Sequence, residues 1–242
     1  GVFQVESRAQ SNILGRLQPR RFDDLVIAIS LVRPGPLVGN MTHPYLRRRE
    51  GTEAVTYLHP LLEPVLQPTL GVILFQEQVL QALHALSGLP LGVGEQIRRC
   101  LGKPHRAAQL GRLFERFRRG AEARGVSAEV CDEVWEALKA FGGYSFPRAH
   151  AAAFAVLVYQ SAWLKYYHHG AFTVGLLNHQ PMGFWPAATL VGDAQRHGVT
   201  MLPVDIQHSD ARCTLLSETR LRLGLNYFEG LGEAGATRIV EA

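Results

Sequence analysis

The chain has 242 residues, of which 47% are hydrophobic, enough for one or two packed domains. The formal net charge is only +4, and no apolar run reaches the roughly 18–20 residues that cross a membrane. With no recognisable signal peptide either, these features argue against a membrane-bound or exported protein and predict a cytoplasmic one. Three widely separated cysteines without zinc-site spacing indicate reduced thiols.

The basic residues are strongly biased toward arginine. Only three of the 25 are lysines (Lys103, Lys139 and Lys165), which leaves 22 arginines. Arginine makes planar, bidentate contacts with phosphate, so the bias fits a phosphate-handling surface. Codon bias in a GC-rich genome would give the same composition, and the sequence does not separate the two causes.

The first 60 residues are irregular but apolar, with one clear helical pattern. Apolar residues at i, i+3, i+4 and i+7 from Phe22 predict a helix over 22–29. This helix should end before Arg33-Pro34-Gly35-Pro36, because a proline disfavours helix at the residue before it. Three further prolines between 60 and 68 predict short turns.

The middle of the chain is predicted to be helical. Residues 71–75 form a short buried strand or an extended lead-in to a helix that ends at Gly88. Amphipathic helices follow over 107–124 and from Ser127, the predicted N-cap, to Gly142-Gly143. Residues 151–167 are apolar on all sides, which predicts a buried helix.

The last quarter changes in composition. One more short helix should end near Asn178, and prolines and glycine over 181–186 mark a linker. Pro186 can open a helix at its first position, and Gly198 can close it. Short strands are expected over 201–206, 213–216 and 221–225, with a turn at 217–219 between the last two. The expected fold class is therefore mainly α with short β segments.

Two clusters of cations suggest a nucleotide site. Arg148 and His150 lie at a turn that opens the long apolar helix, a position that suits a site for an anion. Upstream, Arg98, Arg99 and Lys103 place three cations within six residues. Such a cluster suits a triphosphate, although it lacks the P-loop spacing and would look the same as a surface basic patch.

Two further groups of arginines are candidates for contact with a nucleic-acid backbone. They are Arg47, Arg48 and Arg49, which are consecutive, and Arg112, Arg116 and Arg119, which share one face of a helix. A solvated helix surface has the same pattern, so both readings stay open.

Other motifs carry weaker signals. Gly230-Leu231-Gly232 before a helical pattern fits the hairpin of a helix-hairpin-helix element, or a simple connection between helices. Glu77 should complement the dipole of its own helix. Asp23 and Asp24 are adjacent, so their side chains diverge by roughly 100° in a helix. The nine histidines other than His150 show no paired spacing and are expected to be surface or satisfied residues.

Several motifs occur together in the order found in one polymerase family. They are residues 1–7, 33–36 and 71–78, Arg98-Arg99-x-x-Gly102-Lys103, and Phe146-x-Arg148-Ala149-His150-x-Ala152. Over nearly its whole length the chain resembles the bacterial DNA polymerase III alpha subunit, a C-family polymerase, in its fingers region and the start of its tandem helix-hairpin-helix module. Residues 38–49, 145–147, 180–184 and 196–199 resemble the error-prone branch; the replicative form usually has Asn-Lys in place of Pro147-Arg148.

The resemblance implies template-directed nucleotidyl transfer from dNTPs to primer-template DNA, in replication and damage-induced translesion repair. Arg98, Arg99 and Lys103 would hold the triphosphate. Arg148 would support them, and His150 would press on the sugar and exclude a 2′-hydroxyl. Gly230 and Gly232 would rest on duplex phosphates without reading sequence. A sliding clamp and other mutagenesis proteins are partners that the family suggests.

Two-metal nucleotidyl transfer needs clustered carboxylates that hold the ions about 4 Å apart. In this family the palm aspartates that bind Mg²⁺ lie upstream of the matching region, and the chain contains no D-x-D. We therefore expect a fragment that is inactive alone. Its expected parts are a fingers region (1–178), a linker with a small α/β segment (179–225) and the truncated start of the helix-hairpin-helix module (226–242). The alternative is a non-catalytic DNA-binding or scaffold protein without a working palm.

Overall fold

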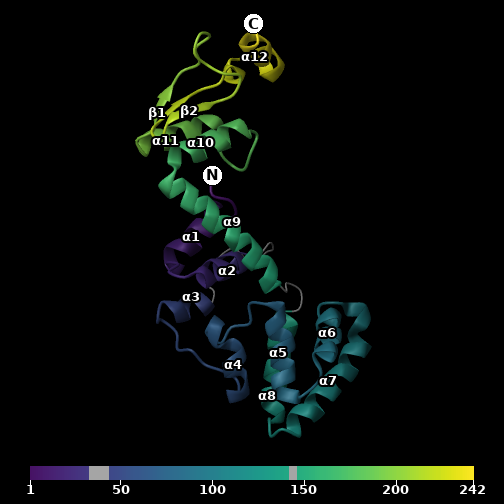
Figure 1. The fold of residues 1–242 in the computed structure, drawn as a ribbon. Helices are drawn as coiled ribbons and strands as arrows, with labels where there is room; N and C mark the ends of the chain where they lie inside the picture. The colour runs from purple at the N-terminus through teal and green to yellow at the C-terminus, as the bar shows by residue number, and fades with distance from the viewer. Residues whose placement is uncertain (33–43, 142–145) are drawn as a thin grey trace. The chain divides into compact units, whose positions relative to one another are not determined.

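The computed structural model describes residues 1–32, 44–141 and 146–242, and it divides into two compact units. The first, called here the helical unit, comprises Ser7–Ala155. The second, called the mixed unit, comprises Gly1–Glu6 together with Val156–Ala242. Figure 1 shows that helices dominate and that the strands belong to the mixed unit, so the predicted fold class is confirmed.

The helical unit begins with three helices, α1 (Arg8–Leu17), α2 (Phe22–Leu31) and α3 (Pro44–Arg49). The predicted helix over 22–29 is α2, and it ends at Leu31, before Arg33, as expected. Helix α1 was not predicted, because its apolar stripe is short (Ile13, Leu14 and Leu17) and its only buried residues are Gln10 and Leu17. Gln10 fixes α1 to α2 by donating from Nε2 to the carbonyl oxygen of Ala28 at 3.3 Å.

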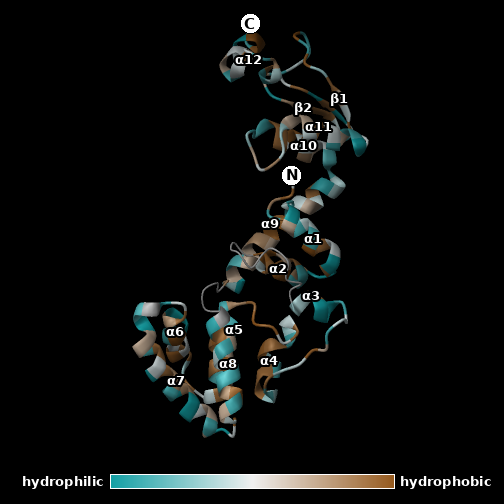
Figure 2. Cartoon of the chain, turned by 180° about the vertical axis from the view of Figure 1, so that it is seen from behind, coloured by the Kyte–Doolittle hydropathy of each residue, from teal (hydrophilic) through white to brown (hydrophobic). Residues whose placement is uncertain are grey.

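Prolines break the next segment into short turns, as predicted. These are η2 (Pro60–Leu62), α4 (Glu63–Leu66) and η3 (Gln67–Thr69). The segment 71–75 is then an extended lead-in with a single bridge between Phe75 and Phe146. Helix α5 (Gln76–Ser87) follows and ends at Gly88, whose φ is 69°. In Figure 2 the lead-in and α4 are largely brown, in keeping with their apolar sequence.

The core of the helical unit lies between α5 and three later helices. These are α6 (Leu91–Cys100), α7 (Ala107–Glu122) and α8 (Ala128–Phe141), with η4 (Pro104–Arg106) between α6 and α7. The inward stripes of α5, α7 and α8 have buried centres, among them Leu83, Phe117 and Leu138 at 0% exposure, whereas Leu110, Phe114 and Val130 are half-buried. Ser127 caps α8, as predicted, by accepting the N–H of Val130 at 3.4 Å. The expected end of α8 at 142–143 lies outside the described residues.

Helix α6 was not predicted as a helix, since its arginines drew attention to a basic cluster instead. Its apolar stripe is short (Val93, Ile97 and Cys100) and is interrupted by two glycines, so the periodic signal is weak. Ile97 is nonetheless fully buried. Packing against α5 and α7, rather than intrinsic propensity, therefore accounts for this helix.

The mixed unit packs two helices against a small sheet. Helix α10 (His169–Asn178) and helix α11 (Ala187–Arg196) are followed by β1 (Thr200–Leu202), β2 (Thr214–Ser217) and β3 (Arg220–Arg222). The strand order is β1-β3-β2, with β1 parallel and β2 antiparallel to β3. Leu177, Leu190 and Leu221 lie in its core. The unit ends with η5 (Leu225–Tyr227) and α12 (Gly232–Val240).

These elements agree with the predicted ones to within a few residues. Pro186 is the N-cap of α11 rather than its first residue, because its carbonyl oxygen already accepts the N–H groups of Thr189 and Leu190. Gly198, with φ of 82°, follows the end of the helix as expected.

The prediction that residues 151–167 form a buried helix is wrong. Helix α9 (Arg148–Tyr167) is present, but only three of its residues, Ala151, Ala155 and Val158, are buried. This single row at i, i+4 and i+7 is what one packed face of a helix covers. Tyr166 is 80% exposed, so an apolar composition on all sides did not require burial on all sides.

The close approach of α7 to α5 gives a stability prediction. A Cβ on Gly120 would lie 2.6 Å from the backbone oxygen of Ser87, whereas one on Gly111 of the same helix would meet nothing within 4 Å. We expect Gly120→Ala to destabilise the protein by about 1–3 kcal/mol. Gly111→Ala should stabilise it by about 0.5–1 kcal/mol through helix propensity.

The measurement is thermal unfolding of both variants, followed by circular dichroism. Gly111→Ala is the matched control, because both changes add the same methyl group to the same helix. A melting temperature for Gly120→Ala equal to that of Gly111→Ala would contradict the tight contact.

Candidate nucleotide and nucleic-acid interface

Arg98 and Arg99 lie in the last turn of α6 and share one carboxylate. Arg98 donates from Nε and Nη2 to the two oxygens of Glu95 at 2.7 and 2.8 Å, and Arg99 donates from Nε at 2.7 Å. These bonds, above all those from Arg98, lower the pKa of Glu95 to about 2. One acid thus orients two arginines and neutralises one of their two charges.

Arg148 begins α9 and is held by three groups of the helical unit. Its backbone N–H donates to the two oxygens of Glu77 at 3.1 and 3.0 Å, so Glu77 caps α9 from another helix. Its guanidinium pairs with Asp23 at 3.1 Å and lies over the ring of Phe75, 5.9 Å from the centroid. The side chain is exposed on its remaining side.

Glu77 also connects the two predicted cation clusters. The pKa of Arg98 is raised mainly by its hydrogen bond with Glu95, and the negative charge of Glu77 adds to this effect. Arg148 contacts Glu77 directly through its backbone N–H, whereas the effect of Glu77 on Arg98 is electrostatic. Lys103 follows α6 after Gly102, whose φ is 70°, and is exposed.

His150 lies two residues beyond Arg148, on the exposed first turn of α9. Its ring meets Phe146 and Phe154 edge to face, with centroid distances of 5.3 and 4.5 Å. These rings restrict the orientation of the imidazole while one side of it stays open to solvent. Such a side chain is suited to a steric test of a bound group.

A cavity of about 730 Å³ lies beside Arg148. Its lining includes both cations and acids, among them Arg21, Arg49, Asp23 and Glu77. Asp24, beneath it in α2, accepts N–H groups from Arg20 and Arg21 at 2.8 and 3.1 Å and pairs with Arg49 at 3.1 Å. Burial alone would raise the pKa of Asp24, but these partners outweigh burial and lower it.

Asp23 and Asp24 point to different partners, as their adjacency in a helix predicted. Asp23 is exposed and binds Arg148, whereas Asp24 is 1% exposed and binds Arg49. The two carboxylates therefore do not form one metal-binding pair.

The three consecutive arginines of α3 are engaged within the helical unit. Arg47 and Arg48 donate to the two oxygens of Glu53 at 2.6 and 2.8 Å, and Arg49 pairs with Asp24. Arg48 is only 13% exposed and also donates to the carbonyl oxygen of Leu70 at 2.7 Å. Their first role is thus to fasten the loop after α3, and their contact with DNA stays a prediction.

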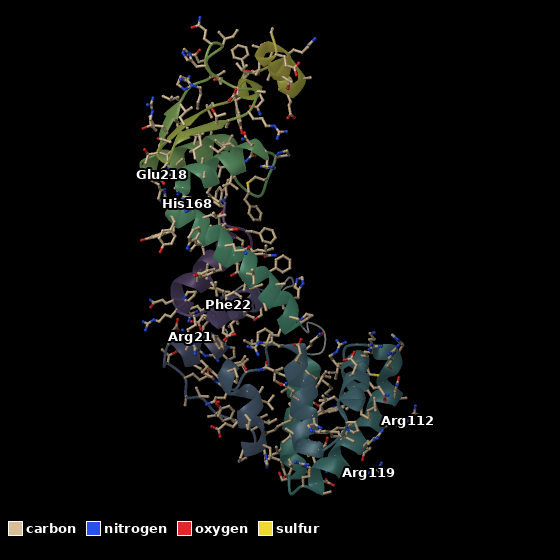
Figure 3. All side chains as sticks on the ribbon, viewed as in Figure 1. Arg21, Phe22, Arg112, Arg119, His168 and Glu218 are labelled. Carbon is tan, nitrogen blue, oxygen red and sulfur yellow. The ribbon has the colours of Figure 1, made fainter. Side chains whose placement is uncertain are left out.

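The row of arginines on α7 is exposed, as its amphipathic pattern predicted. Figure 3 labels Arg112 and Arg119, whose side chains extend outward from the helix. Arg119 also donates to the carbonyl oxygen of Glu115 at 3.3 Å. Arg116 lies between them on the same helix face.

The glycine hairpin before α12 is open on its outer side. Gly230 and Gly232 have φ of 82° and 64°, and a Cβ on either would meet nothing within 4 Å. Glu233 in the first turn of α12 would repel a phosphate, but it is paired with Arg212, whose Nε donates to Oε1 at 2.9 Å. Arg212 adds a cation at this helix N-terminus that sequence reasoning missed.

Comparison with known proteins decides the family. The model of the bacterial DNA polymerase III alpha subunit finger domain matches residues 1–125, and that of a helix-hairpin-helix motif matches residues 198–242. The chain belongs to the bacterial DNA polymerase III alpha subunit finger-domain family. None of the helices in the described part of the chain is both long and apolar enough to cross a bilayer.

Curated relatives of this polymerase III finger-domain chain are named error-prone DNA polymerases. Over the full length of this chain, the protein from Corynebacterium efficiens is 47% identical and the protein from Nocardia farcinica is 49% identical. The protein from Teredinibacter turnerae is 44% identical, again over the full length of the chain. The chain spans 22%, 21% and 24% of these three relatives. The boundaries predicted at 178 and 225 stay a prediction.

Sequence reasoning found the cations of this finger domain but missed the acids that position them. The spacing of Glu95 from Arg98 and Arg99 (i+3 and i+4) was readable in the sequence once α6 was recognised as a helix. The contacts of Arg148 with Glu77 and Asp23 join residues 71 and 125 positions apart, so no local pattern announces them.

The low pKa of Glu95 gives a prediction about stability and pH. Because this pKa lies below the unfolded value of 4.5, the stabilisation is full above about pH 4.5 and is lost as pH falls toward 2. We expect Glu95→Gln to lower the free energy of unfolding at pH 7 by about 1 kcal/mol, since the pair is partly exposed to solvent. The deficit should shrink as pH falls from 4.5 to 2.

Urea unfolding of wild type and variant at several pH values measures this difference. Glu136→Gln is the control, because Glu136 is 69% exposed and pairs only with the exposed Lys139 among the described ion pairs. It should change stability by only a few tenths of a kcal/mol. A pH-independent deficit in Glu95→Gln would show that the carboxylate charge is not the cause.

Proposed function

We propose that this chain is the fingers region, with the start of the helix-hairpin-helix module, of an error-prone DNA-directed DNA polymerase. The relatives are named error-prone DNA polymerases, which supports the polymerase activity. The finger-domain match supports the assignment of this chain to the fingers region of that enzyme. The observation that carries the proposal is that carboxylates orient the cations of both predicted clusters: Glu95 pairs with Arg98 and Arg99, and Asp23 pairs with Arg148. Replication, translesion repair, a cytoplasmic location, the sliding clamp and other mutagenesis proteins stay predictions.

The arginines of α6 are proposed to exchange one anion for another. Arg98 and Arg99 make charge-assisted bonds with Glu95, and a triphosphate offers the same kind of oxygen acceptor. Glu95 thus holds the guanidinium groups in place until the incoming dNTP binds. Lys103 and Arg148 then add charge, so that the site matches the several negative charges of a triphosphate.

His150 is proposed to test the sugar of the dNTP. Its ring is braced by two phenylalanines and lies on the same exposed turn as Arg148. A 2′-hydroxyl placed against this ring would clash or would leave a polar group without a partner. The side chain would therefore act by shape and not by proton transfer.

DNA contact is proposed for the exposed cations and for the glycine hairpin. Arg112, Arg116 and Arg119 would follow the phosphate backbone, and Gly230 and Gly232 would let duplex phosphates approach the N-terminus of α12. Such contacts position the duplex without reading its sequence. Arg47, Arg48 and Arg49 would join them only by exchanging their present carboxylate partners.

The intact polymerase would use Mg²⁺, which stabilises charge on the transferred phosphoryl group. Among the described residues, the cluster of potential metal ligands contains two histidines and one carboxylate, which does not suit this oxygen-seeking ion. The residues that hold Mg²⁺ would therefore lie elsewhere in the polymerase. This chain would contribute nucleotide and DNA binding and is expected to be inactive alone.

The first test is Arg98→Ala and Arg99→Ala in the intact polymerase. Loss of one charged contact costs about 1.5–3 kcal/mol, so kcat/KM for dNTP should fall roughly tenfold or more. Lys139→Ala, which removes an exposed cation of α8, is the control and should leave kcat/KM unchanged. Unchanged kcat/KM for both arginine variants would refute the assignment.

The second test concerns sugar selection. His150→Ala should raise the incorporation of ribonucleotides relative to deoxyribonucleotides, because it removes the ring that the sugar would meet. The measurement is the ratio of kcat/KM for a dNTP and its matching NTP in single-nucleotide extension. His150→Phe, which keeps a ring of similar bulk, should preserve the selection. Equal ratios in wild type and His150→Ala would show that His150 does not select the sugar and only packs against its neighbours.

A further inference from the structure

Two helices of the mixed unit bring together a group of residues that sequence reasoning had set aside. His169 of α10 and Asp193 and His197 of α11 each offer a ligand atom within 4.8 Å of the others. The histidines are 28 positions apart, so no metal-binding spacing was visible in the sequence. None of the three has a role in the proposed nucleotide or DNA contacts.

The hydrogen bonds of the two imidazoles fix their tautomers. His169 Nδ1 lies 3.0 Å from the carbonyl oxygen of Lys165, and His197 Nδ1 lies 2.8 Å from that of Asp193. A carbonyl oxygen only accepts, so Nδ1 carries the hydrogen in each neutral ring and the lone pair is on Nε2. Zinc-binding histidines are typically supported as His169 is here, by a carbonyl oxygen that accepts the N–H of the other ring nitrogen.

The spacing of the donors suits a small tetrahedral ion. His169 Nε2 lies 3.6 Å from Asp193 Oδ2. Two donors at ordinary Zn–N and Zn–O distances with a tetrahedral angle between them are about 3.4 Å apart. His169 is only 12% exposed and is therefore fixed, whereas His197 is 51% exposed and has room to turn. The rings now stack with centroids 4.3 Å apart, and His197 faces Asp193 Oδ1 through Nδ1 at 3.6 Å. Coordination through Nε2 therefore needs a rotation of His197 that gives up its bond to the carbonyl oxygen of Asp193.

A lysine would compete with a metal ion for the carboxylate of Asp193. Lys165 Nζ lies 3.0 Å from Asp193 Oδ2, the oxygen that faces His169. Arg196 lies on the other side, 3.6 Å from Oδ1. The ammonium group therefore supplies positive charge to this carboxylate, and a metal ion would have to displace it.

We propose that His169, Asp193 and His197 form a binding site for Zn²⁺, with water as the fourth ligand and Lys165 as an internal competitor. Two imidazoles and one carboxylate select zinc over Mg²⁺ and Ca²⁺, which prefer oxygen ligands. The bound ion ties α10 to α11 beside the core formed by Leu177 and Leu190. The site stabilises the mixed unit when occupied.

The test is titration of the metal-free 242-residue chain with Zn²⁺, and with Co²⁺ as a spectroscopic probe of tetrahedral coordination. We expect one zinc ion to bind and the melting temperature to rise. His169→Gln and Asp193→Asn should each weaken binding by at least about tenfold, the scale that loss of a supporting partner alone produces. His208→Gln is the control, since His208 forms an exposed pair with Asp205 in the same unit.

Lys165→Met gives the opposite expectation and guards against variants that fail to fold. Removal of the ammonium group should strengthen zinc binding, and a double variant with Asp193→Asn should lose the gain. The proposal is overturned if wild type and Lys165→Met both bind no Zn²⁺ under conditions in which they are folded. It is equally overturned if His169→Gln and Asp193→Asn bind zinc as tightly as His208→Gln does.

Discussion

The contact between Glu77 and the backbone N–H of Arg148 is the interaction on which the candidate nucleotide site depends. It caps the start of α9 with a side chain of α5, and the bridge between Phe75 and Phe146 fixes the same junction. Arg148 and His150 take their positions from this junction, because both lie on the first turn that Glu77 orders. The negative charge of Glu77 also contributes to the raised pKa of Arg98, after the larger effect of the hydrogen bond with Glu95.

Acidic partners recur beside the arginines of this chain. Glu95 serves Arg98 and Arg99, Glu53 serves Arg47 and Arg48, and Asp24 serves Arg49. A guanidinium held by a carboxylate keeps its direction and loses part of its net charge. The pairs that are buried, such as Asp24 with Arg49, belong to the architecture, whereas exposed pairs such as Arg99 with Glu95 can exchange partners at little cost.

Several helices depend on close approach as well as on apolar burial. Gly120 lets α7 reach the backbone of α5, and Gly170 lets α10 reach the turn between β2 and β3, where a Cβ would lie 2.4 Å from the carbonyl oxygen of Glu218. These contacts explain glycines within helices, where helix propensity alone disfavours them. They also place α10 next to α11 and the sheet, which is the setting of the His169, Asp193 and His197 cluster.

The sequence by itself determined most helices, the short strands and the exposed cations of α7. Their signals are local: apolar periodicity, caps and the turn residues at Gly88, Ser127 and Gly198. It also carried the family, through the order of several motifs.

Only the tertiary structure decided what the polar residues bind and which apolar residues are covered. Helix α1 has only a short apolar stripe, α6 is held by its neighbours, and α9 is covered on one face only, in contrast to its composition. The partners of Arg148 and the meeting of His169 with His197 join distant positions. Such contacts depend on how helices pack, and helix packing is set by the summed fit of many side chains rather than by any local pattern.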